Sequence, residues 1–230
     1  MKIKYHFFGK NCVIDRALKN RTNLAKSMLE QGFSNQKVLF VNQIHGFEVA
    51  LIDKAQKIYG EQNLPKADAL VSNLPNVVLG VVTADCAPIL LFDEQEKIIA
   101  AVHAGWRGAK LGVVESTILQ MKNLGAKNIS AIIGPTIQQN SYEVSTDFFD
   151  DFLSESANNK IFFVSGANSG KYLFDLPFYV EEKLLKAGVK KIQNQKVDTY
   201  KNEEIFYSFR RSTHQNQQDC GRNISIIAIE

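Results

Sequence analysis

The chain has 230 residues, 45% hydrophobic and 22% charged, which is close to average for a globular protein and allows a sizeable core. A net charge of only +3 without a basic cluster excludes a nucleic-acid-binding surface, and no apolar run approaches the roughly 18 residues of a membrane span. The first residues lack the apolar stretch of a signal peptide, and three widely spaced cysteines argue against a disulfide framework, so we expect a cytoplasmic protein.

The first half of the chain predicts one helix and four strands. The helix covers residues 18–29 and ends before Gly32. Short runs rich in β-branched and aromatic residues then predict strands at 38–41, 77–82, 89–92 and 98–102. Several of these runs are apolar throughout, as in strands that are covered on both faces.

The second half begins with a predicted helix. Leu111, Val114, Ile118 and Met121 recur at helical spacing, and Gly125 follows as a stop. We then expect, in order, a strand at 129–133, a loop at 154–160, a strand at 161–164, a helix capped by Asp175 that ends at Gly188, a strand at 205–209, a loop at 212–219 and a strand at 224–229. No repeat or linker interrupts this pattern, which predicts one α/β domain over residues 1–230 with mixed sheets.

Two histidines and one cysteine stand where predicted strands end. His45 follows the strand at 38–41, Cys86 the strand at 77–82, and His103 the strand at 98–102. Zinc binds imidazole and thiolate, and three protein ligands with an open fourth position are its catalytic arrangement. No compact zinc-finger spacing is present, so Cys86 as a small core residue and histidines bonded to backbone carbonyls remain open alternatives.

Seven short segments resemble motifs of the YfiH-like family, long labelled polyphenol oxidases or laccases and now described as purine nucleoside phosphorylases. They run in order over most of the chain: NQIHG at 42–46, ADALV at 67–71, TADCAP at 83–88, AVHAGWRG at 101–108, IGP at 133–135 with YEV at 142–144, and YSFRR at 207–211. Two features depart from the family: the N-terminal motif at 7–12 is shorter, and the usual cysteine pair before Tyr142 is missing.

The resemblance implies a fold and an activity. The fold is a single domain with mixed β-sheets layered between helices, which also resembles deamidating bacterial toxins of the CNF type. The ligands it implies are His45, Cys86 and His103, holding zinc, with copper as an alternative. The activity is phosphorolysis of purine nucleosides (adenosine, inosine and methylthioadenosine) with adenosine deamination as a side activity, so the expected partners are a nucleoside and phosphate. No particular oligomeric state is predicted.

Phosphorolysis requires further residues around such a metal. Arg107 is our candidate for gripping phosphate, with a structural ion pair as the alternative. Asp85 can orient a ligand or accept a sugar hydroxyl, or simply form a turn, and Glu143 is the candidate base for the purine. The substrate-binding candidates are Gln43, Trp106, Tyr142 and Arg211; Arg210 and Arg222 are weaker candidates, and for Asp68 we expect a structural role.

The sequence also bears on three other functions. A multicopper oxidase needs more histidines than the four in this chain. Cys86 with His103 can instead form a thiol hydrolase or deamidase, including one that edits a peptidoglycan precursor. In a closed, non-catalytic zinc site, a fourth ligand would come from His6, His214, Cys12 or Cys220.

Overall fold

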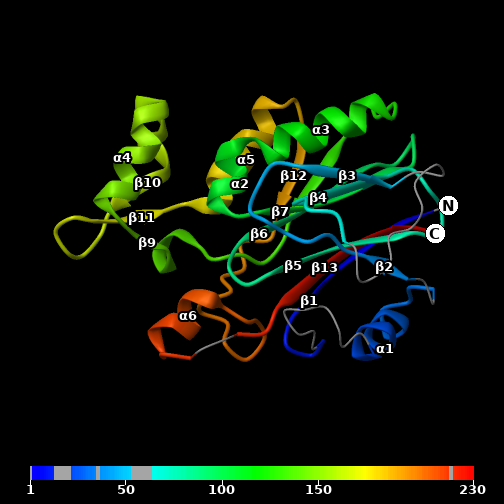
Figure 1. The fold of residues 1–230 in the computed structure, drawn as a ribbon, viewed down its shortest axis with the longest axis horizontal. Helices are drawn as coiled ribbons and strands as arrows, with labels where there is room; N and C mark the ends of the chain where they lie inside the picture. Colours follow the sequence, from blue (N-terminus) through cyan, green and yellow to red (C-terminus); the bar gives the residue numbers. More distant parts are fainter. Residues whose placement is uncertain (1, 13–21, 35–36, 53–63, 218–219) are drawn as a thin grey trace.

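The computed structural model describes residues 2–12, 22–34, 37–52, 64–217 and 220–230 (Figure 1). Its helices are α1 (Thr22–Glu30), α2 (Trp106–Leu111), α3 (Val113–Asn123), α4 (Thr146–Glu155), α5 (Leu176–Lys186) and α6 (Phe209–His214), with short 3-10 helices η1 (Gln139–Ser141) and η2 (Ala157–Phe162). Its strands are β1 (Ile3–Phe8), β2 (Val38–Leu39), β3 (Val49–Ile52), β4 (Ala69–Ser72), β5 (Val78–Thr83), β6 (Ala87–Asp93), β7 (Ile98–Ala104), β8 (Ser130–Ile133), β9 (Glu143–Ser145), β10 (Phe163–Ser165), β11 (Lys171–Phe174), β12 (Lys191–Asn194) and β13 (Asn223–Ile229).

The largest sheet has six strands in the order β12-β8-β6-β7-β4-β3. Its centre is the antiparallel pair β6 and β7, whose register places Pro88 opposite His103 and Asp93 opposite Ile98. The outer pairs, β3 with β4 and β8 with β12, are parallel, so the sheet is mixed. This register puts the start of β6 and the end of β7 at the same edge, which brings residues distant in sequence together.

A second sheet has four strands in the order β1-β13-β5-β2. The last strand, β13, lies between β1 and β5 and pairs antiparallel with both of them. All seven residues of β13 are buried, as expected of a strand that is covered on both faces.

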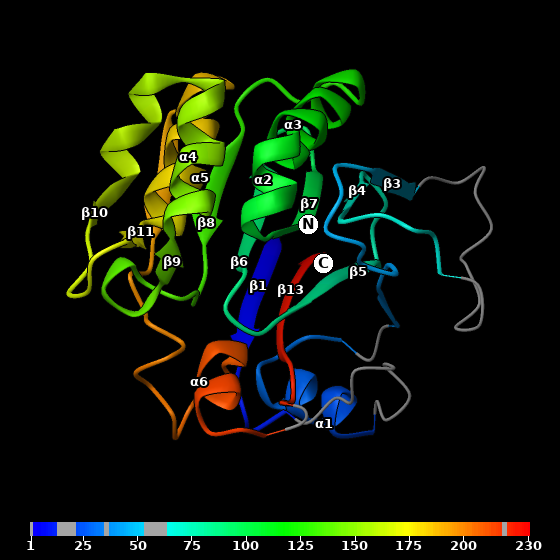
Figure 2. The same cartoon turned by 60° about the vertical axis from the view of Figure 1, so that its left-hand side comes forward.

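The two sheets lie face to face between helices (Figure 1). Along β7, Ala100 and Val102 belong to the core shared with α3 and α5, whereas Ile99 and Ala101 pack between the sheets. This alternation follows from the two-residue period of a strand. The outer face of the four-stranded sheet has its own core with α1, and both α1 and α6 lie on that side (Figure 2). The observed order is therefore helix, sheet, sheet, helix.

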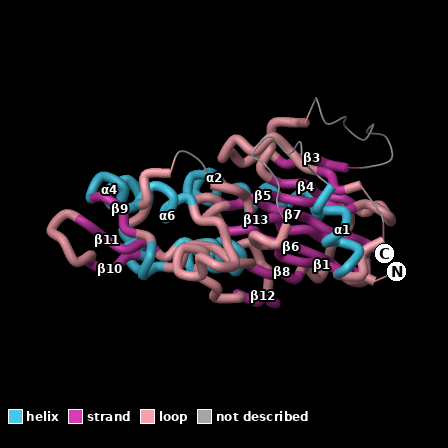
Figure 3. The backbone as a smooth tube through the Cα atoms, turned by 90° about the horizontal axis from the view of Figure 1, so that it is seen from below, coloured by secondary structure: helices cyan, strands magenta, loops and turns pink. Residues whose placement is uncertain are grey.

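A third sheet, β10-β11-β9, projects with α4 at the end of the molecule away from the two termini (Figure 3). Its interior is largely aromatic: Phe152 of α4 contacts Phe163 and Phe174 with ring centroids 5.6 and 4.9 Å apart. These rings belong to the same core that lies under α3 and α5, so the projection is continuous with the rest of the fold.

Most of the predicted elements are present. Strands occur within a few residues of the positions predicted at 38–41, 77–82, 89–92, 98–102, 129–133 and 224–229. The helix capped by Asp175 is confirmed, since its carboxylate accepts a hydrogen bond of 3.0 Å from the Phe178 N–H. The helix predicted at 18–29 corresponds to α1; the part of the prediction before residue 22 lies outside the described residues.

Along the second half, one prediction was wrong and three were wrong in part. The run at 205–209 is not a strand, because Ile205 and Phe209 are 55% and 62% exposed and Ser208 caps α6. Residues 161–162 belong to η2, and the strand there starts at Phe163. The loops expected at 154–160 and 212–219 are partly helical, because α4 continues to Glu155, η2 follows it, and α6 continues to His214; residues 218–219 lie outside the described part.

Among the described residues, no helix combines the length and the apolar character that crossing a membrane requires.

Candidate functional site

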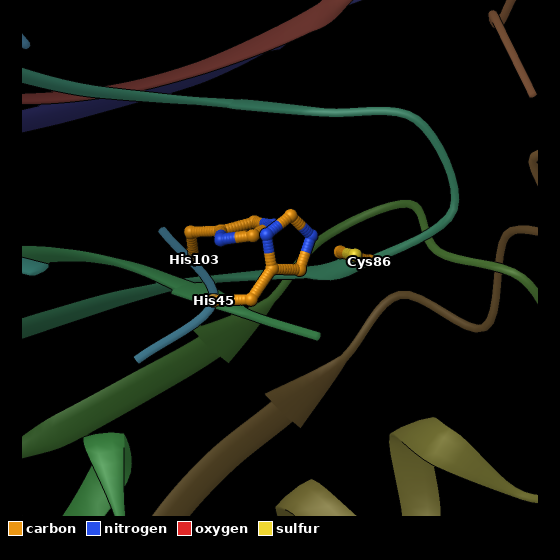
Figure 4. A group of neighbouring side chains, drawn as sticks. All are labelled: His45, Cys86 and His103. Atoms are coloured by element: carbon orange, nitrogen blue, oxygen red, sulfur yellow. The ribbon is translucent and has the colours of Figure 1, made fainter. Parts of the chain in front are cut away.

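Three side chains from separate segments converge at the edge where β6 begins and β7 ends. The ligand atoms of His45, Cys86 and His103 all lie within 4.8 Å of one another. Figure 4 shows the two imidazole rings side by side with the Cys86 thiol beyond them; the ring centroids are 4.7 Å apart. His103 is buried in β7, Cys86 is partly buried in the turn between β5 and β6, and His45 is exposed. No fourth His, Cys, Asp or Glu joins this group within the described ranges.

One buried carboxylate organises two of the three ligands. Asp68 Oδ1 accepts hydrogen bonds from the backbone N–H of His45 (2.9 Å) and from His103 Nδ1 (2.8 Å). Its Oδ2 accepts the N–H groups of Ile44 (3.1 Å) and Gly46 (2.7 Å). The loop around His45, where this residue has a left-handed φ of 58°, is thus fixed to the sheet. Because Nδ1 of His103 is occupied, Nε2 is the nitrogen left for a metal.

Two glycines allow the backbone to approach these ligands. A Cβ atom on Gly105 would lie 2.9 Å from Cys86 Sγ and 3.2 Å from His45 Cδ2. A Cβ atom on Gly108 would lie 2.8 Å from the Gly46 carbonyl oxygen. A side chain at Gly105 would therefore displace Cys86 or His45, and a side chain at Gly108 would displace the loop that carries His45.

The protonation states of Cys86 and His103 are coupled. Burial raises the pKa of Cys86, but His103 and His45 outweigh it and bring that pKa down to about 6. Burial lowers the pKa of His103, whereas the Cys86 thiolate and Asp68 raise it, to about 9 overall. At neutral pH the metal-free protein therefore holds a thiolate beside an imidazolium. A soft thiolate and two imidazoles within reach of one ion form a donor set that fits zinc.

The ligand group opens into a pocket of about 250 Å³, slightly below the range of about 300–1,000 Å³ usual for small-molecule sites. His45 and Cys86 form one part of its lining. The remaining lining residues are mainly aromatic or aliphatic, with one cation: Ala84, Asp85, Trp106, Ile137, Tyr142, Leu176, Phe209 and Arg210. An apolar pocket with a few polar groups and shifted pKa values is the usual form of a binding site.

Asp85 lines this pocket, but its carboxylate is held by three donors. Its Oδ1 accepts from Thr199 Oγ1 at 2.7 Å, and its Oδ2 accepts from Ser208 Oγ at 3.0 Å and from the Arg210 N–H at 2.6 Å. The left-handed φ of 85° at Asp85 directs the chain between these partners and Cys86. The residue therefore ties the segment at 199–210 to the cysteine ligand.

The two neighbouring arginines of α6 have different surroundings. Arg211 is buried, and its guanidinium donates to the carbonyls of Thr199, Tyr200 and Phe206 at 2.5–2.8 Å, so the structure does not bring it into the pocket. Arg210, which we ranked below Arg211, lines the pocket instead.

The other predicted residues divide between pocket and surroundings. Trp106 and Tyr142 line the pocket. Gln43 instead bonds both backbone groups of Val82, at 2.8 and 2.9 Å, and so holds its loop against β5. Glu143 lies outside the lining and contributes its backbone carbonyl to Arg210. Arg107 is exposed beside Trp106 and makes no side-chain hydrogen bond or ion pair with the described residues.

The prediction that His45, Cys86 and His103 lie in one group agrees with the structure, but two contributors to the site were missed. Asp68 was assigned a structural role, and it does hold a loop, but it also orients a ligand. The sequence signal for this role is the place of Asp68 between two alanines at the start of a buried strand, where an unpaired carboxylate would be costly. Phe209 was assigned to a strand, although it lines the pocket.

The chain is similar to known proteins over most of its length. Residues 10–230 match the family model described as multi-copper polyphenol oxidoreductase laccase. A protein of Rickettsia conorii named purine nucleoside phosphorylase is 40% identical over 199 residues, which cover 86% of this chain and 80% of the relative. The purine nucleoside phosphorylase YfiH of Escherichia coli K12 is 34% identical over 203 residues, covering 88% and 78%.

Solved structures are similar along nearly the whole chain. Protein NMB0706 of Neisseria meningitidis, assigned to the family DUF152, superposes with a TM-score of 0.76 at 32% identity over 91% of this chain and 81% of the other. The YfiH protein of Bacillus licheniformis shares the fold with a TM-score of 0.85 at 22% identity, covering 99% and 93%. The matched family model and these relatives show that the chain belongs to the YfiH-like purine nucleoside phosphorylase family.

Proposed function

We propose that this protein is a zinc-dependent purine nucleoside phosphorylase acting on adenosine, inosine or methylthioadenosine. The observation that carries the proposal is that two members of the His45, Cys86 and His103 group line the same pocket as Trp106 and Tyr142. Aromatic rings are suited to stack on a purine, and relatives at 34–40% identity bear the name purine nucleoside phosphorylase.

The reaction exchanges one bond for another at the sugar. An oxygen of phosphate forms a bond to C1′ of the ribose while the bond from C1′ to the base nitrogen breaks. The electron pair of that bond stays on the base, which takes up the proton that phosphate gives up, so the products are the free base and ribose 1-phosphate. When bound, zinc supplies positive charge that stabilises an anionic reactant beside the sugar.

The protein's own residues position these reactants. Asp68 holds His103 by Nδ1, and Asp85 holds the segment at 199–210, so the walls of the pocket are set before substrate arrives. Arg107 remains our candidate for attracting phosphate at the mouth, because its exposed guanidinium follows Trp106 of the lining. We also propose slow deamination of adenosine in this pocket, in which water adds to C6 of the purine and the amino group leaves as ammonia, so that the product is inosine.

Laccase chemistry does not fit the residues present. An electron-transfer copper site alone takes two histidines, a cysteine and usually a methionine, and an oxygen-reducing cluster takes several more histidines. The chain contains four histidines in all. Copper shares a preference for thiolate and imidazole, so the metal content of the purified protein decides between a zinc site and a single copper site.

A thiol hydrolase or deamidase is the second candidate, favoured by one observation. In the metal-free protein the Cys86 thiolate lies beside the His103 imidazolium, and Asp68 accepts from the other ring nitrogen at 2.8 Å. A nucleophile, a base and an orienting carboxylate in this order are the arrangement of cysteine hydrolases. Hydrolysis of a peptidoglycan precursor belongs to this class.

A single set of assays separates the two functions. Zinc-loaded protein with inosine and phosphate should release hypoxanthine and ribose 1-phosphate, and both products should disappear on chelation and return with zinc. Base release that does not depend on phosphate would contradict phosphorolysis. Activity that survives chelation but is lost when Cys86 is alkylated would establish the thiol hydrolase instead.

A further inference from the structure

The pocket contains a guanidinium that forms no ion pair with the described residues. Arg210 is partly buried and lines the pocket together with Cys86 and Tyr142. Its side chain takes part in no ion pair among the described residues, and the nearby Asp85 carboxylate is bonded to Thr199 Oγ1, Ser208 Oγ and the Arg210 backbone N–H. A partly buried cation whose side chain forms no ion pair is able to bind an anionic ligand.

The Arg210 side chain is held in place without using up its donors. One Nη1–H donates to the Glu143 carbonyl at 2.7 Å, and the guanidinium carbon lies 5.3 Å from the centre of the Tyr142 ring. An arginine has five N–H donors, so four stay available once the bond to Glu143 is made. Arg211 differs from Arg210, since its guanidinium donates hydrogen bonds to three backbone carbonyls.

Tyr142 adds a neutral donor beside this cation. Its hydroxyl has no hydrogen-bond partner among the described residues, and its ring lines the pocket. Burial is the largest cause that raises its pKa, the charges of Cys86 and Asp85 raise it further, and Arg210 lowers it. The phenol therefore stays protonated at neutral pH and can donate a hydrogen bond.

The position of Arg210 is coupled to the ligand group through the backbone. Asp85 directly precedes Cys86 in the chain, and its Oδ2 accepts the Arg210 N–H at 2.6 Å. The guanidinium and the thiolate thus belong to walls of one pocket that share a common anchor.

We propose that Arg210 and Tyr142 form an oxyanion-binding subsite, and that its ligand is inorganic phosphate, the nucleophile of the reaction. This inference rests on the proposed function for the identity of the anion. It assigns to Arg210 the contact with phosphate inside the pocket, whereas Arg107, which is exposed and outside the lining, is the candidate for attracting phosphate from solution. A planar guanidinium with free N–H groups grips a tetrahedral oxyanion through two parallel hydrogen bonds.

The test compares Arg210→Gln, Arg210→Lys and Tyr142→Phe in the zinc-loaded protein with Lys201→Gln as a charge-matched control. Lys201 is exposed and does not line the pocket. We expect Arg210→Gln to raise the phosphate KM by roughly 10- to 100-fold, the range given by loss of a charge-assisted hydrogen bond, with zinc content and inosine KM near wild type. Arg210→Lys, which keeps the charge and loses the fork, should give a smaller increase, and Lys201→Gln none.

Calorimetric titration with phosphate alone separates this inference from the proposed function. If the wild-type protein binds phosphate and Arg210→Gln does not, the subsite stands even when no nucleoside is turned over, and only phosphorolysis fails. A phosphate KM within twofold of wild type in Arg210→Gln, with Arg107→Gln carrying the whole phosphate dependence, would overturn the inference. If Arg210→Gln is unfolded, the same criterion applies to Arg210→Lys.

Discussion

Replacing Asp68 by asparagine tests whether one carboxylate supports the metal ligands. Each oxygen of Asp68 accepts two hydrogen bonds: Oδ1 from His45 N–H and His103 Nδ1, and Oδ2 from the N–H groups of Ile44 and Gly46. The amide of asparagine has one acceptor oxygen and one donor nitrogen. In either orientation two N–H groups that had an acceptor would face a second donor.

The size of the effect follows from this count. Each buried donor that loses its acceptor costs about 1–3 kcal/mol, so two cost about 2–6 kcal/mol. The orientation that keeps oxygen toward His103 leaves the two donors of the exposed loop unpaired, where water can reach them, so we expect a loss near 2 kcal/mol. For a chain of this size that lowers Tm by roughly 4–8 °C. Loss of the charged partner of His103 should weaken zinc binding by about 10- to 100-fold.

The chain provides a matched control in Asp93→Asn. Asp93 is also fully buried and accepts four backbone N–H groups, those of Gln95, Glu96, Lys127 and Asn128. It lies at the opposite end of β6 from Cys86, about 23 Å away along seven strand residues. The expected result is a similar loss of stability in both variants, measured by denaturant unfolding of the metal-free proteins.

Zinc affinity should separate the two variants. Competition with a chromogenic chelator should show weaker binding for Asp68→Asn and wild-type binding for Asp93→Asn. Equal zinc affinities for Asp68→Asn and the wild type, or an equal loss in both variants, would refute the idea that Asp68 acts on the metal site through His103.

Two further predictions concern the same group of residues. Gly105→Ala should abolish most zinc binding while leaving the fold intact, because its Cβ would lie 2.9 Å from Cys86 Sγ; stoichiometric zinc in the variant, measured by atomic absorption, would contradict this. In the metal-free protein, Cys86 has a pKa of about 6, so its thiolate predominates above that pH and is lost as pH falls through 6. The rate of Cys86 carboxamidomethylation, followed by mass spectrometry, should be flat from pH 7 to 8 and fall about tenfold per unit well below pH 6; a rate that still rises between pH 7 and 8 would mean an ordinary thiol.

The parts of the fold that sequence predicted are those where burial dominates. The run at 98–102 is apolar throughout, and the run at 224–229 is apolar except for Ser225, because both faces of β7 and β13 are covered. Strands with mixed composition, such as β9 and β12, have exposed or partly exposed residues and therefore lack a clear pattern. The run at 205–209 gave a wrong prediction for the opposite reason, since Ile205 and Phe209 are apolar but exposed, and of its apolar residues only Phe206 is buried.

The candidate site also has a part that the sequence predicts and a part that it does not. His45, Cys86 and His103 belong to residue types that are rare in this chain, and each lies in a segment that resembles a motif of the family. The sequence is therefore enough to suggest them as a group. The choice between Arg210 and Arg211 depends on which guanidinium meets the carbonyls of Thr199, Tyr200 and Phe206. That contact is set by how a short helix packs, and neighbouring positions in a sequence do not reveal it.

The position of β13 sets an order in which the molecule can be completed during synthesis. Because β13 lies between β1 and β5, the four-stranded sheet lacks its central strand until residues 223–229 have left the ribosome. Until then β5, which leads into the turn that carries Cys86, is paired only with the two residues of β2. The nascent chain therefore carries an apolar strand edge of the kind that chaperones bind until the last strand has been inserted.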